Sequence, residues 1–221
     1  MRIIFTRNLE FILENYVSNN SYIEYMKQLS LKEQLDVFYD IGSNKGEWSD
    51  LVSKIFSKSD FHLFEANPIH KINSKRDRFE DHFVVLSSKQ SELVFYSKGE
   101  TGDSYYPEIN KIYTENERKL VKTDTLDNYV LANKLPLPDF IKLDTQGSEL
   151  DILRGGISTL RNCKYLLIEI SILDYNKGSP NFSEYIRTLD TLNFYPIKLV
   201  ETHFTNGKLT QLDLLFSRKP E

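Results

Sequence analysis

The chain has 221 residues, of which 40% are hydrophobic and 27% are charged, a balance typical of one folded domain rather than a disordered chain. The net charge is −4, so the sequence lacks the basic surplus of most nucleic-acid-binding proteins. Its single cysteine, Cys163, excludes an intrachain disulfide, and no stretch is apolar and long enough for a signal peptide or a membrane span. We therefore expect a soluble, cytoplasmic protein that binds neither nucleic acid nor a membrane.

The first 35 residues carry the spacing of amphipathic helices. Apolar residues within 9–17 recur at positions i, i+3, i+4, i+7 and i+8, and Ile23, Met26 and Leu29 continue an apolar face. We predict a helical extension over 1–35 that packs on a domain formed by 36–221. A helix that binds a partner protein is the alternative.

From residue 36 onward, short apolar runs alternate with helix-like segments. The runs have the continuous hydrophobicity of strands buried on both faces of a parallel sheet. Asn67-Pro68 fits a helix N-cap followed by proline, and 148–151 and 181–184 resemble capping boxes. The alternation predicts an α/β fold with a doubly wound, mostly parallel sheet and right-handed crossovers. The predicted strands are 37–39, 61–64, 82–86, 140–143 and 165–170.

The end of the chain has a different pattern. Two strand-like segments, 194–204 and 209–216, are separated by Asn206-Gly207. Asn-Gly between two strands is the strongest short-range signal for a hairpin, so we predict that the last two strands are antiparallel neighbours.

The first predicted strand runs into a loop that reads Asp40-x-Gly42-x-Asn44-x-Gly46. It matches neither a phosphate-binding Walker A loop nor the three-glycine dinucleotide fingerprint, although its glycines allow the backbone to approach a ligand closely. The Asp40 carboxylate would repel a pyrophosphate but attract a cationic ligand. S-adenosylmethionine, with its sulfonium and its ammonium group, fits that sign. Structurally, Asn44 and Glu47 also fit the N-cap and third position of a helix.

Further acids follow other predicted strands. Glu65 ends the second strand, 25 residues after Asp40, where nucleotide-binding folds place the acid that accepts the ribose hydroxyls. Asp144 follows strand 140–143, at the sheet edge where open α/β folds bind ligands. A cap for the following turn is the structural alternative for Asp144, and Glu149 fits a favourable charge on the helix dipole. Glu169 is a further acid in the same region.

Two stretches resemble the FkbM family of methyltransferases. Residues 37–67 begin with VFYDIGSNKGEWS and end with HLFEANP, and a second stretch contains VKTDTLDNYV, DFIKLDTQGSELDILRGG and YLLIEIS. The KLDTQGSELDILRGG block is the most specific, and with the small-residue loop Gly102-Asp103-Ser104 the resemblance covers about 36–217. It implies a class I fold with a seven-stranded sheet in the order 3-2-1-4-5-7-6. It also implies S-adenosylmethionine as cofactor and methyl transfer to oxygen, often on a sugar or a small metabolite.

Individual residues can be matched to this family. The loop from Asp40 to Gly46 corresponds to the cofactor loop, Glu65 to the ribose acid, and Ser87 or Ser88 to the adenine contact. Gln146 stands where many members have glutamate, which removes one acid from the site. The candidate cofactor-binding residues, from these motifs and their neighbours, are Asp40, Gly42, Ser43, Asn44, Gly46, Trp48, Glu65, Ala66, Asn67, Ser87, Ser88 and Asp144.

Methyl transfer to a hydroxyl requires an aligned acceptor and the removal of its proton by a base or a metal-bound group. Asp144 is the first candidate, as a base or as a ligand for a divalent ion, and His203 is the second. The other histidines, His62, His70 and His82, lack a metal-ligand spacing, so structural or surface roles are expected and no metal ligand is assigned.

Several readings stay open. Tyr105 and Tyr106 suit either a loop over a flat or sugar-like acceptor or the packing of a strand edge, and Trp48 either packs or borders the cofactor. A dehydrogenase would also use an acid after the second strand, but its first turn should carry the three-glycine fingerprint, which this sequence lacks. A catalytically silent scaffold or regulator that binds S-adenosylmethionine is the main alternative to an enzyme. A small-molecule or glycan acceptor is expected, but the sequence gives neither its identity nor the oligomeric state.

Overall fold

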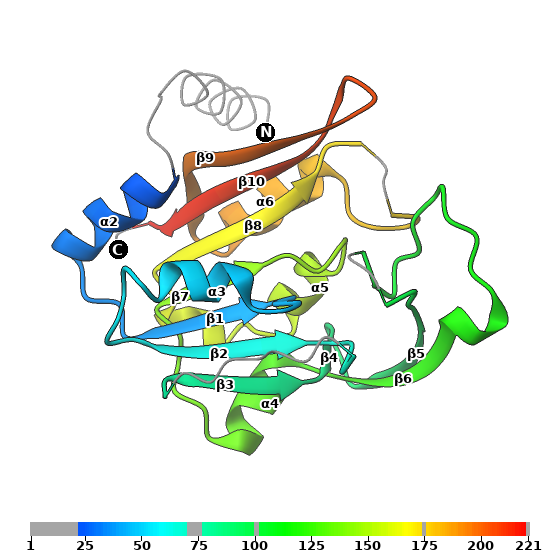
Figure 1. Ribbon diagram of the computed structural model, residues 1–221, viewed down its shortest axis with the longest axis horizontal. Coiled ribbons are helices and arrows are strands. Elements are labelled where there is room, and N and C mark those ends of the chain that lie inside the picture. The colour runs from blue at the N-terminus through cyan, green and yellow to red at the C-terminus, as the bar shows by residue number, and fades with distance from the viewer. Residues whose placement is uncertain (1–21, 70–76, 100–101, 174–175, 220–221) are drawn as a thin grey trace.

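The computed structural model describes residues 22–69, 77–99, 102–173 and 176–219 as a layered α/β fold (Figure 1). Its centre is a seven-stranded sheet in the order β3-β2-β1-β7-β8-β10-β9. Numbered along the chain, these strands have the order 3-2-1-4-5-7-6, so the predicted fold class and strand order are confirmed. The strands are β1 (Val37–Ile41), β2 (Asp60–Glu65), β3 (Phe79–Phe83), β7 (Phe140–Leu143), β8 (Tyr165–Ser171), β9 (Phe194–Thr205) and β10 (Lys208–Arg218).

The first five of these strands pair in parallel, and β10 runs antiparallel to both β8 and β9. Asn206 and Gly207 connect β9 to β10 with φ angles of 52° and 73°. Two successive left-handed residues match the twist of a tight hairpin, and asparagine and glycine accept this conformation at the lowest cost. The predicted hairpin is therefore confirmed.

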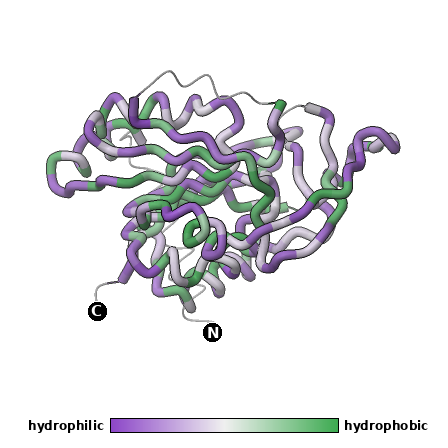
Figure 2. The backbone as a smooth tube through the Cα atoms, turned by 90° about the horizontal axis from the view of Figure 1, so that it is seen from below, coloured by the Kyte–Doolittle hydropathy of each residue, from purple (hydrophilic) through white to green (hydrophobic). Residues whose placement is uncertain are grey.

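Helices cover both faces of the sheet (Figure 1). Side chains alternate along the buried strands, so Phe38 enters a core on one face and Tyr39 a core on the other. The first face carries α2 (Tyr22–Lys32) and α3 (Glu47–Val52), and the second carries α4 (Leu126–Asn133), α5 (Glu149–Arg154) and α6 (Phe182–Thr191). Figure 2 shows hydrophobic stretches gathered in the interior strands, with hydrophilic stretches outside them.

Met26 and Leu29 of α2 are buried in the first core, so this helix packs on the sheet. The amphipathic pattern predicted for 9–17 lies outside the described residues, and the division of the chain at 35/36 stays a prediction. Among the described helices, none combines the length and the apolar character needed to cross a lipid bilayer.

A second, three-stranded sheet was not predicted. It has the order β4-β6-β5 and lies beyond the carboxyl ends of β1 and β2 (Figure 1). The single strand predicted over 82–86 is wrong: β3 ends at Phe83, Val84 bonds to the carbonyl of Glu65, and the next two residues join the small sheet. Its strands are β4 (Val85–Leu86), β5 (Ser91–Tyr96) and β6 (Arg118–Asp124).

The predicted helix starts had mixed outcomes. At α6 the capping box is confirmed, because Asn181 and Glu184 exchange side-chain to backbone hydrogen bonds of 3.2 and 2.8 Å. The box predicted from Ser148 is wrong, since its hydroxyl donates to the Thr145 carbonyl at 3.1 Å instead. The N-cap of α3 is Gly46 with φ 78°, not Asn44. The helix predicted after Asn67-Pro68 falls largely on residues outside the description.

Candidate functional site

The carboxyl ends of β1, β2, β7 and β8 border a cavity of about 450 Å³, within the usual size range of small-molecule sites. At β1 the connections of the sheet change direction, with β2 on one side and β7 on the other. Open α/β sheets bind their ligands at this topological switch point. The cavity is lined by the loop after β1, the end of β2, the small sheet and the turn after β7.

The loop after β1 packs its backbone directly on the turn after β7. Gly42 has φ +81°, and a Cβ atom there would lie 1.9 Å from the Asp144 carbonyl oxygen. Glycine is required on both counts. Next to it, the buried Oγ of Ser43 and Oδ1 of Asn44 have no hydrogen-bond partner within the described part of the chain. Such orphaned acceptors are costly unless a ligand donates to them.

Asp40 lies beneath this loop instead of on the cavity wall. Its Oδ2 accepts a 2.7 Å bond from the Ser49 hydroxyl, and the Lys142 ammonium lies 3.6 Å from its Oδ1. Burial raises the pKa of Asp40, against the opposing effects of Lys142 and Ser49. The direct attraction expected between Asp40 and a cationic ligand therefore needs correction, because Lys142 is the cation that Asp40 meets.

Glu65 does reach the cavity wall. Its two carboxylate oxygens accept the backbone N–H groups of Asn44 at 2.9 Å and Asn67 at 2.8 Å. Asn67 in turn donates its side-chain amide to the Ser97 hydroxyl at 3.0 Å and to Asp103 Oδ2 at 2.7 Å. Glu65 thus has a fixed orientation, and through Asn67 it joins the loop after β1 to the segment that follows β5.

One wall of the cavity is apolar. Phe64, Val84, Leu86 and Phe95 contribute to it, and three of these four come from segments that the sequence did not assign to the site. Five of the residues predicted to bind the cofactor line the cavity, namely Gly42, Asn44, Glu65, Ala66 and Asp144. The structure places the others away from the wall, namely Asp40, Ser43, Gly46, Trp48, Asn67, Ser87 and Ser88.

Three of the predicted cofactor-binding residues, Ser87, Ser88 and Trp48, do not line the cavity. Ser87 is buried, with its backbone N–H bonded to the Asp124 carbonyl, and Ser88 is exposed. Trp48 packs its ring 5.8 Å from that of Phe140 in the first core, in agreement with the packing alternative.

Asp144 follows β7 and lies on the cavity wall. Its two oxygens accept bonds from Lys142 Nζ at 3.1 Å and from Gln146 Nε2 at 3.3 Å. Burial raises the pKa of Asp144, but Lys142 and Gln146 outweigh that effect and hold it below its ordinary value. Asp144 is therefore ionised at neutral pH and is a weak base.

Glu169 of β8 was not selected as a site residue, yet it lines the same cavity. Its Oε2 accepts from the side-chain amides of Gln146 at 2.8 Å and Gln211 at 2.7 Å. Burial, and then repulsion by Asp144 and Asp213, raises its pKa to about 10. Glu169 is thus a neutral acid at physiological pH, able to donate a hydrogen bond as well as accept one.

His203 of β9, the second catalytic candidate, also lines the cavity. Its Nε2 lies 3.3 Å from Asp213 Oδ1 on β10. Hydrogen bonding to Asp213, partly opposed by burial, raises the pKa of His203. A histidine oriented by a carboxylate is a common general base. With Glu169, the pair also places three metal-ligand atoms within 4.8 Å of one another.

Glu149 has a structural role that its sequence position did not reveal. Its buried carboxylate accepts the backbone N–H groups of Thr145 at 2.8 Å and Gly147 at 3.1 Å, and the hydroxyl of Tyr185. It therefore fixes the turn that carries Asp144.

Replacement of Tyr185 by phenylalanine is expected to lower the free energy of unfolding by about 1–3 kcal/mol, because a buried carboxylate loses a hydrogen-bond donor. Urea denaturation measures this change. Tyr195→Phe is the matched control, since Tyr195 is 40% exposed, and it should change stability by less than about 0.5 kcal/mol. Equal stability of the two variants would contradict the role assigned to Glu149.

The two tyrosines after the glycine-containing loop are anchored to α5. The hydroxyls of Tyr105 and Tyr106 both donate to Asp151 Oδ2, at 3.3 and 2.8 Å. Of the two, Tyr105 lines the cavity, and the Tyr106 carbonyl accepts a bond from Asn176 at 2.7 Å. Tyr105 is therefore the one of the two that lies on the cavity wall.

Comparison with known proteins gives one family. The model of the methyltransferase FkbM domain matches residues 40–195. Hexuronic acid methyltransferase AglP of Haloferax volcanii is 27% identical over 144 residues, which cover 62% of this chain and 57% of that protein. The 2-O-methyltransferase NoeI of Sinorhizobium fredii is 24% identical over 169 residues, which cover 68% of this chain and 70% of that protein.

Solved structures share the fold. The fibrillarin pre-rRNA processing protein of Methanococcus jannaschii superposes with a TM-score of 0.51 at 14% identity, covering 86% of this chain and 69% of its own. Fibrillarin of Aeropyrum pernix, crystallised with natively bound S-adenosylmethionine, gives a TM-score of 0.50 at 12% identity, with 94% and 73% covered. At such low identity these matches establish a common architecture only.

Proposed function

The chain belongs to the FkbM methyltransferase family, and on this premise we propose that it transfers the methyl group of S-adenosylmethionine to a hydroxyl oxygen of a sugar. The observation that carries the proposal is the cavity at the switch point, with Glu65 held on its wall by two backbone N–H groups. The names of the two curated relatives support the acceptor class. This chain spans 57% of the first of them, so the acceptor is part of the proposal.

The residues around the cavity suit S-adenosylmethionine. Glu65 offers carboxylate oxygens to the two ribose hydroxyls, as in other adenosine sites of this architecture. Asn44 Oδ1, which lies on the cavity wall and lacks a partner within the described residues, suits a donor of an α-ammonium group. The apolar wall formed by Val84, Leu86 and Phe95 suits a flat base.

When bound, S-adenosylmethionine supplies a methyl group on a sulfonium, which is already a good leaving group. The work left to the chain is to align the acceptor hydroxyl and to remove its proton. Asp144, with its lowered pKa, is better suited to orient the acceptor than to deprotonate it. His203 has a raised pKa and an orienting carboxylate on Asp213. We therefore place His203 before Asp144 as the general base, the reverse of the order expected from sequence.

Glu169 complements this pair. A carboxyl group that stays protonated at neutral pH donates a hydrogen bond to an acceptor oxygen, and Gln146 and Gln211 hold it in place. A sugar offers several neighbouring hydroxyls, each both donor and acceptor, so the polar end formed by Asp144, Glu169 and His203 fits it better than an apolar acceptor.

Calorimetric titration of S-adenosylmethionine into Glu65→Gln tests the cofactor site. We expect its dissociation constant to rise about 100-fold, because the amide NH2 group that replaces one carboxylate oxygen cannot accept a hydrogen bond from a ribose hydroxyl or from a backbone N–H group. Glu92→Gln, at an exposed position of β5, is the matched control and should bind as wild type does. Unchanged affinity in Glu65→Gln would remove Glu65 from the site.

A second readout separates an enzyme from a silent cofactor-binding scaffold. Wild-type protein is incubated with methyl-labelled S-adenosylmethionine and a panel of uronic-acid and neutral-sugar glycosides, and label in the sugar is counted. Transfer to at least one sugar supports the proposal. Tight cofactor binding with no transfer to any hydroxylated acceptor would favour the scaffold.

A further inference from the structure

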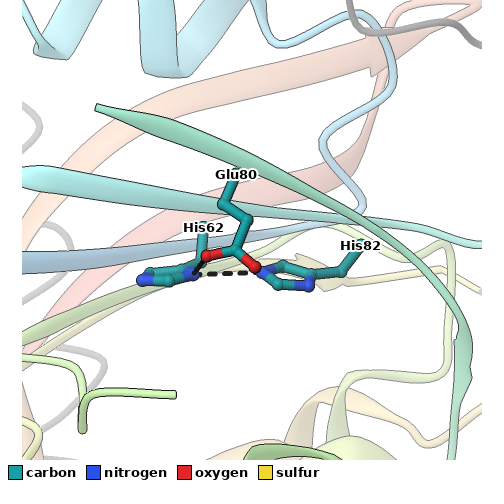
Figure 3. Close-up of side chains that lie close together, drawn as sticks. All are labelled: His62, Glu80 and His82. Carbon is teal, nitrogen blue, oxygen red and sulfur yellow. Dashed lines mark hydrogen bonds and ion pairs between the residues drawn. The ribbon is translucent and has the colours of Figure 1, made fainter. Parts of the chain in front are cut away.

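A second group of side chains that can ligate a metal ion lies on β2 and β3, away from the cavity wall. His62 on β2 and Glu80 and His82 on the edge strand β3 converge on one point (Figure 3). We propose that these three side chains form a binding site for a divalent transition-metal ion of the zinc class. The proposal does not depend on the methyltransferase activity.

The strand register places the three residues together. In the parallel pair β2–β3, His62 stands opposite Glu80, and Phe64 stands opposite His82. Alternate residues of a strand point to the same face, so Glu80 and His82 project beside His62. The site is thus carried by the backbone of two paired strands and not by a loop, which is how rigid metal sites are built.

The distances between ligand atoms fit a tetrahedral ion. His62 Nδ1 lies 3.0 Å from His82 Nε2 and 3.5 Å from Glu80 Oε2, and the three ligand atoms are all within 4.8 Å of one another. Zinc bonds of about 2.0–2.1 Å at tetrahedral angles imply ligand separations of about 3.3 Å. Shifts of a few tenths of an ångström at the two measured pairs would therefore admit the ion.

The two imidazoles are buried and face each other through ring nitrogens. His62 and His82 are 5% and 4% exposed, and His62 Nδ1 lies 3.0 Å from His82 Nε2. Without an ion, one N–H must be shared between the two facing nitrogens; an ion would replace that proton and use both lone pairs.

The surroundings orient His82 and leave the site open to solvent. The Tyr129 hydroxyl lies 3.5 Å from His82 Nδ1, the ring nitrogen that faces away from the ligand group, and the Phe64 ring stacks on His82 at 4.6 Å. Such outer contacts fix the ring and its tautomer in metal sites. The Glu80 side chain is 60% exposed, so an ion can enter from that side and keep a water as fourth ligand.

The donor set selects the class of ion. Two imidazole nitrogens and one carboxylate suit zinc and its neighbours, whereas magnesium and calcium prefer oxygen ligands alone. A bound ion would tie the edge strand β3 to β2. Since β2 ends at Glu65, which pairs with Phe83 of β3, the same two strands support one wall of the cavity.

The test uses the full chain, stripped of metal with a chelator and then titrated with zinc sulfate. We expect saturable binding, and a melting temperature raised by about 5–10 °C when free zinc is about 100-fold above its dissociation constant. Cobalt(II) chloride should give the visible absorption of a tetrahedral site. Glu80→Gln and His82→Gln should each weaken binding at least tenfold.

His203→Gln is the matched control, because it removes a histidine from the other three-residue group of ligand type found in the described residues. It should keep the zinc-dependent rise in melting temperature. Glu80→Gln changes an exposed side chain, so it decides the question even where His82→Gln fails to fold. No zinc-dependent stabilisation of wild type, or its loss in His203→Gln but not in Glu80→Gln, would overturn the proposal.

Discussion

Replacement of His203 by glutamine is expected to lower kcat for sugar methylation by about 10²–10⁴-fold, the range that a positioned general base contributes. Glutamine keeps the size and polarity of the side chain but cannot take up a proton. The dissociation constant for S-adenosylmethionine should change little, because Glu65 and the loop after β1 lie on other elements of the site. Single-turnover kinetics and calorimetry measure the two quantities separately.

The assignment of His203 as the general base also predicts how kcat/KM changes with pH. Asp213 raises the pKa of His203 through their hydrogen bond, and a base works only when it is deprotonated. The quantity kcat/KM should therefore rise with pH, with a midpoint above the ordinary histidine value of about 6.5. Asp213→Asn removes the charge that favours the imidazolium, so the midpoint should move to lower pH.

Asp144→Asn is the comparison that decides between the two candidates. If His203→Gln retained turnover while Asp144→Asn lost it, the base would be Asp144. Glu80→Gln weakens the zinc site proposed on β2 and β3, so turnover of that variant that vanished on treatment with a chelator would instead indicate a metal held by Glu169, His203 and Asp213.

Gly42→Ala is expected to abolish detectable binding of S-adenosylmethionine. The new Cβ would lie 1.9 Å from the Asp144 carbonyl oxygen, a distance that no packed structure tolerates. Either the loop after β1 or the turn after β7 must move, and both line the cavity. The positive φ of Gly42 adds about 1–2 kcal/mol to the cost for any other residue.

Gly207→Ala is the matched control for this variant. Gly207 also has a positive φ, +73°, but a Cβ there would meet nothing within 4 Å. It should lose only the conformational cost, about 1–2 kcal/mol, and bind the cofactor as wild type does. A Gly42→Ala protein that binds S-adenosylmethionine with wild-type affinity would show that the close contact of the two loops is not required.

The sequence predicted the central sheet well because its strands are short apolar runs buried on both faces. Continuous burial leaves a strong hydrophobic signal, and Asn206-Gly207 marks the hairpin by its backbone chemistry alone. The small sheet left a weaker signal. β5 (Ser91–Tyr96) contains the apolar run from Leu93 to Tyr96, but only Phe95 of this run is buried, and charged residues fill most of β6 (Arg118–Asp124).

The pairing of His203 with Asp213 depends on a feature that no pattern revealed. Phe204 pairs with Leu209, but His203 pairs with Gln211, so Thr210 forms a bulge. In a regular two-residue hairpin His203 would face Thr210, and Asp213 would point to the opposite side of the sheet. The bulge brings Asp213 to the face of His203, as bulges near active sites often do.

Lys142 and Glu149 show a second limit of sequence reasoning. Lys142 lies within the strand reading FIKL and received no role from the sequence, yet it contacts both Asp40 and Asp144. Because Lys142 neutralises Asp40 from within the fold, Asp40 can be buried without reaching the cavity wall. The histidines had likewise been given structural roles by sequence spacing, because the register that joins His62 to Glu80 and His82 is a property of the sheet and not of the chain order.

The most direct test of the central claim is calorimetric titration of the wild-type chain with S-adenosylmethionine and, separately, with NAD. The arrangement of Glu65, the glycine loop and the orphaned side-chain oxygen of Asn44 predicts one S-adenosylmethionine bound per chain, with no measurable heat from NAD. A folded wild-type chain that binds NAD but not S-adenosylmethionine would contradict the methyltransferase assignment and restore a dehydrogenase.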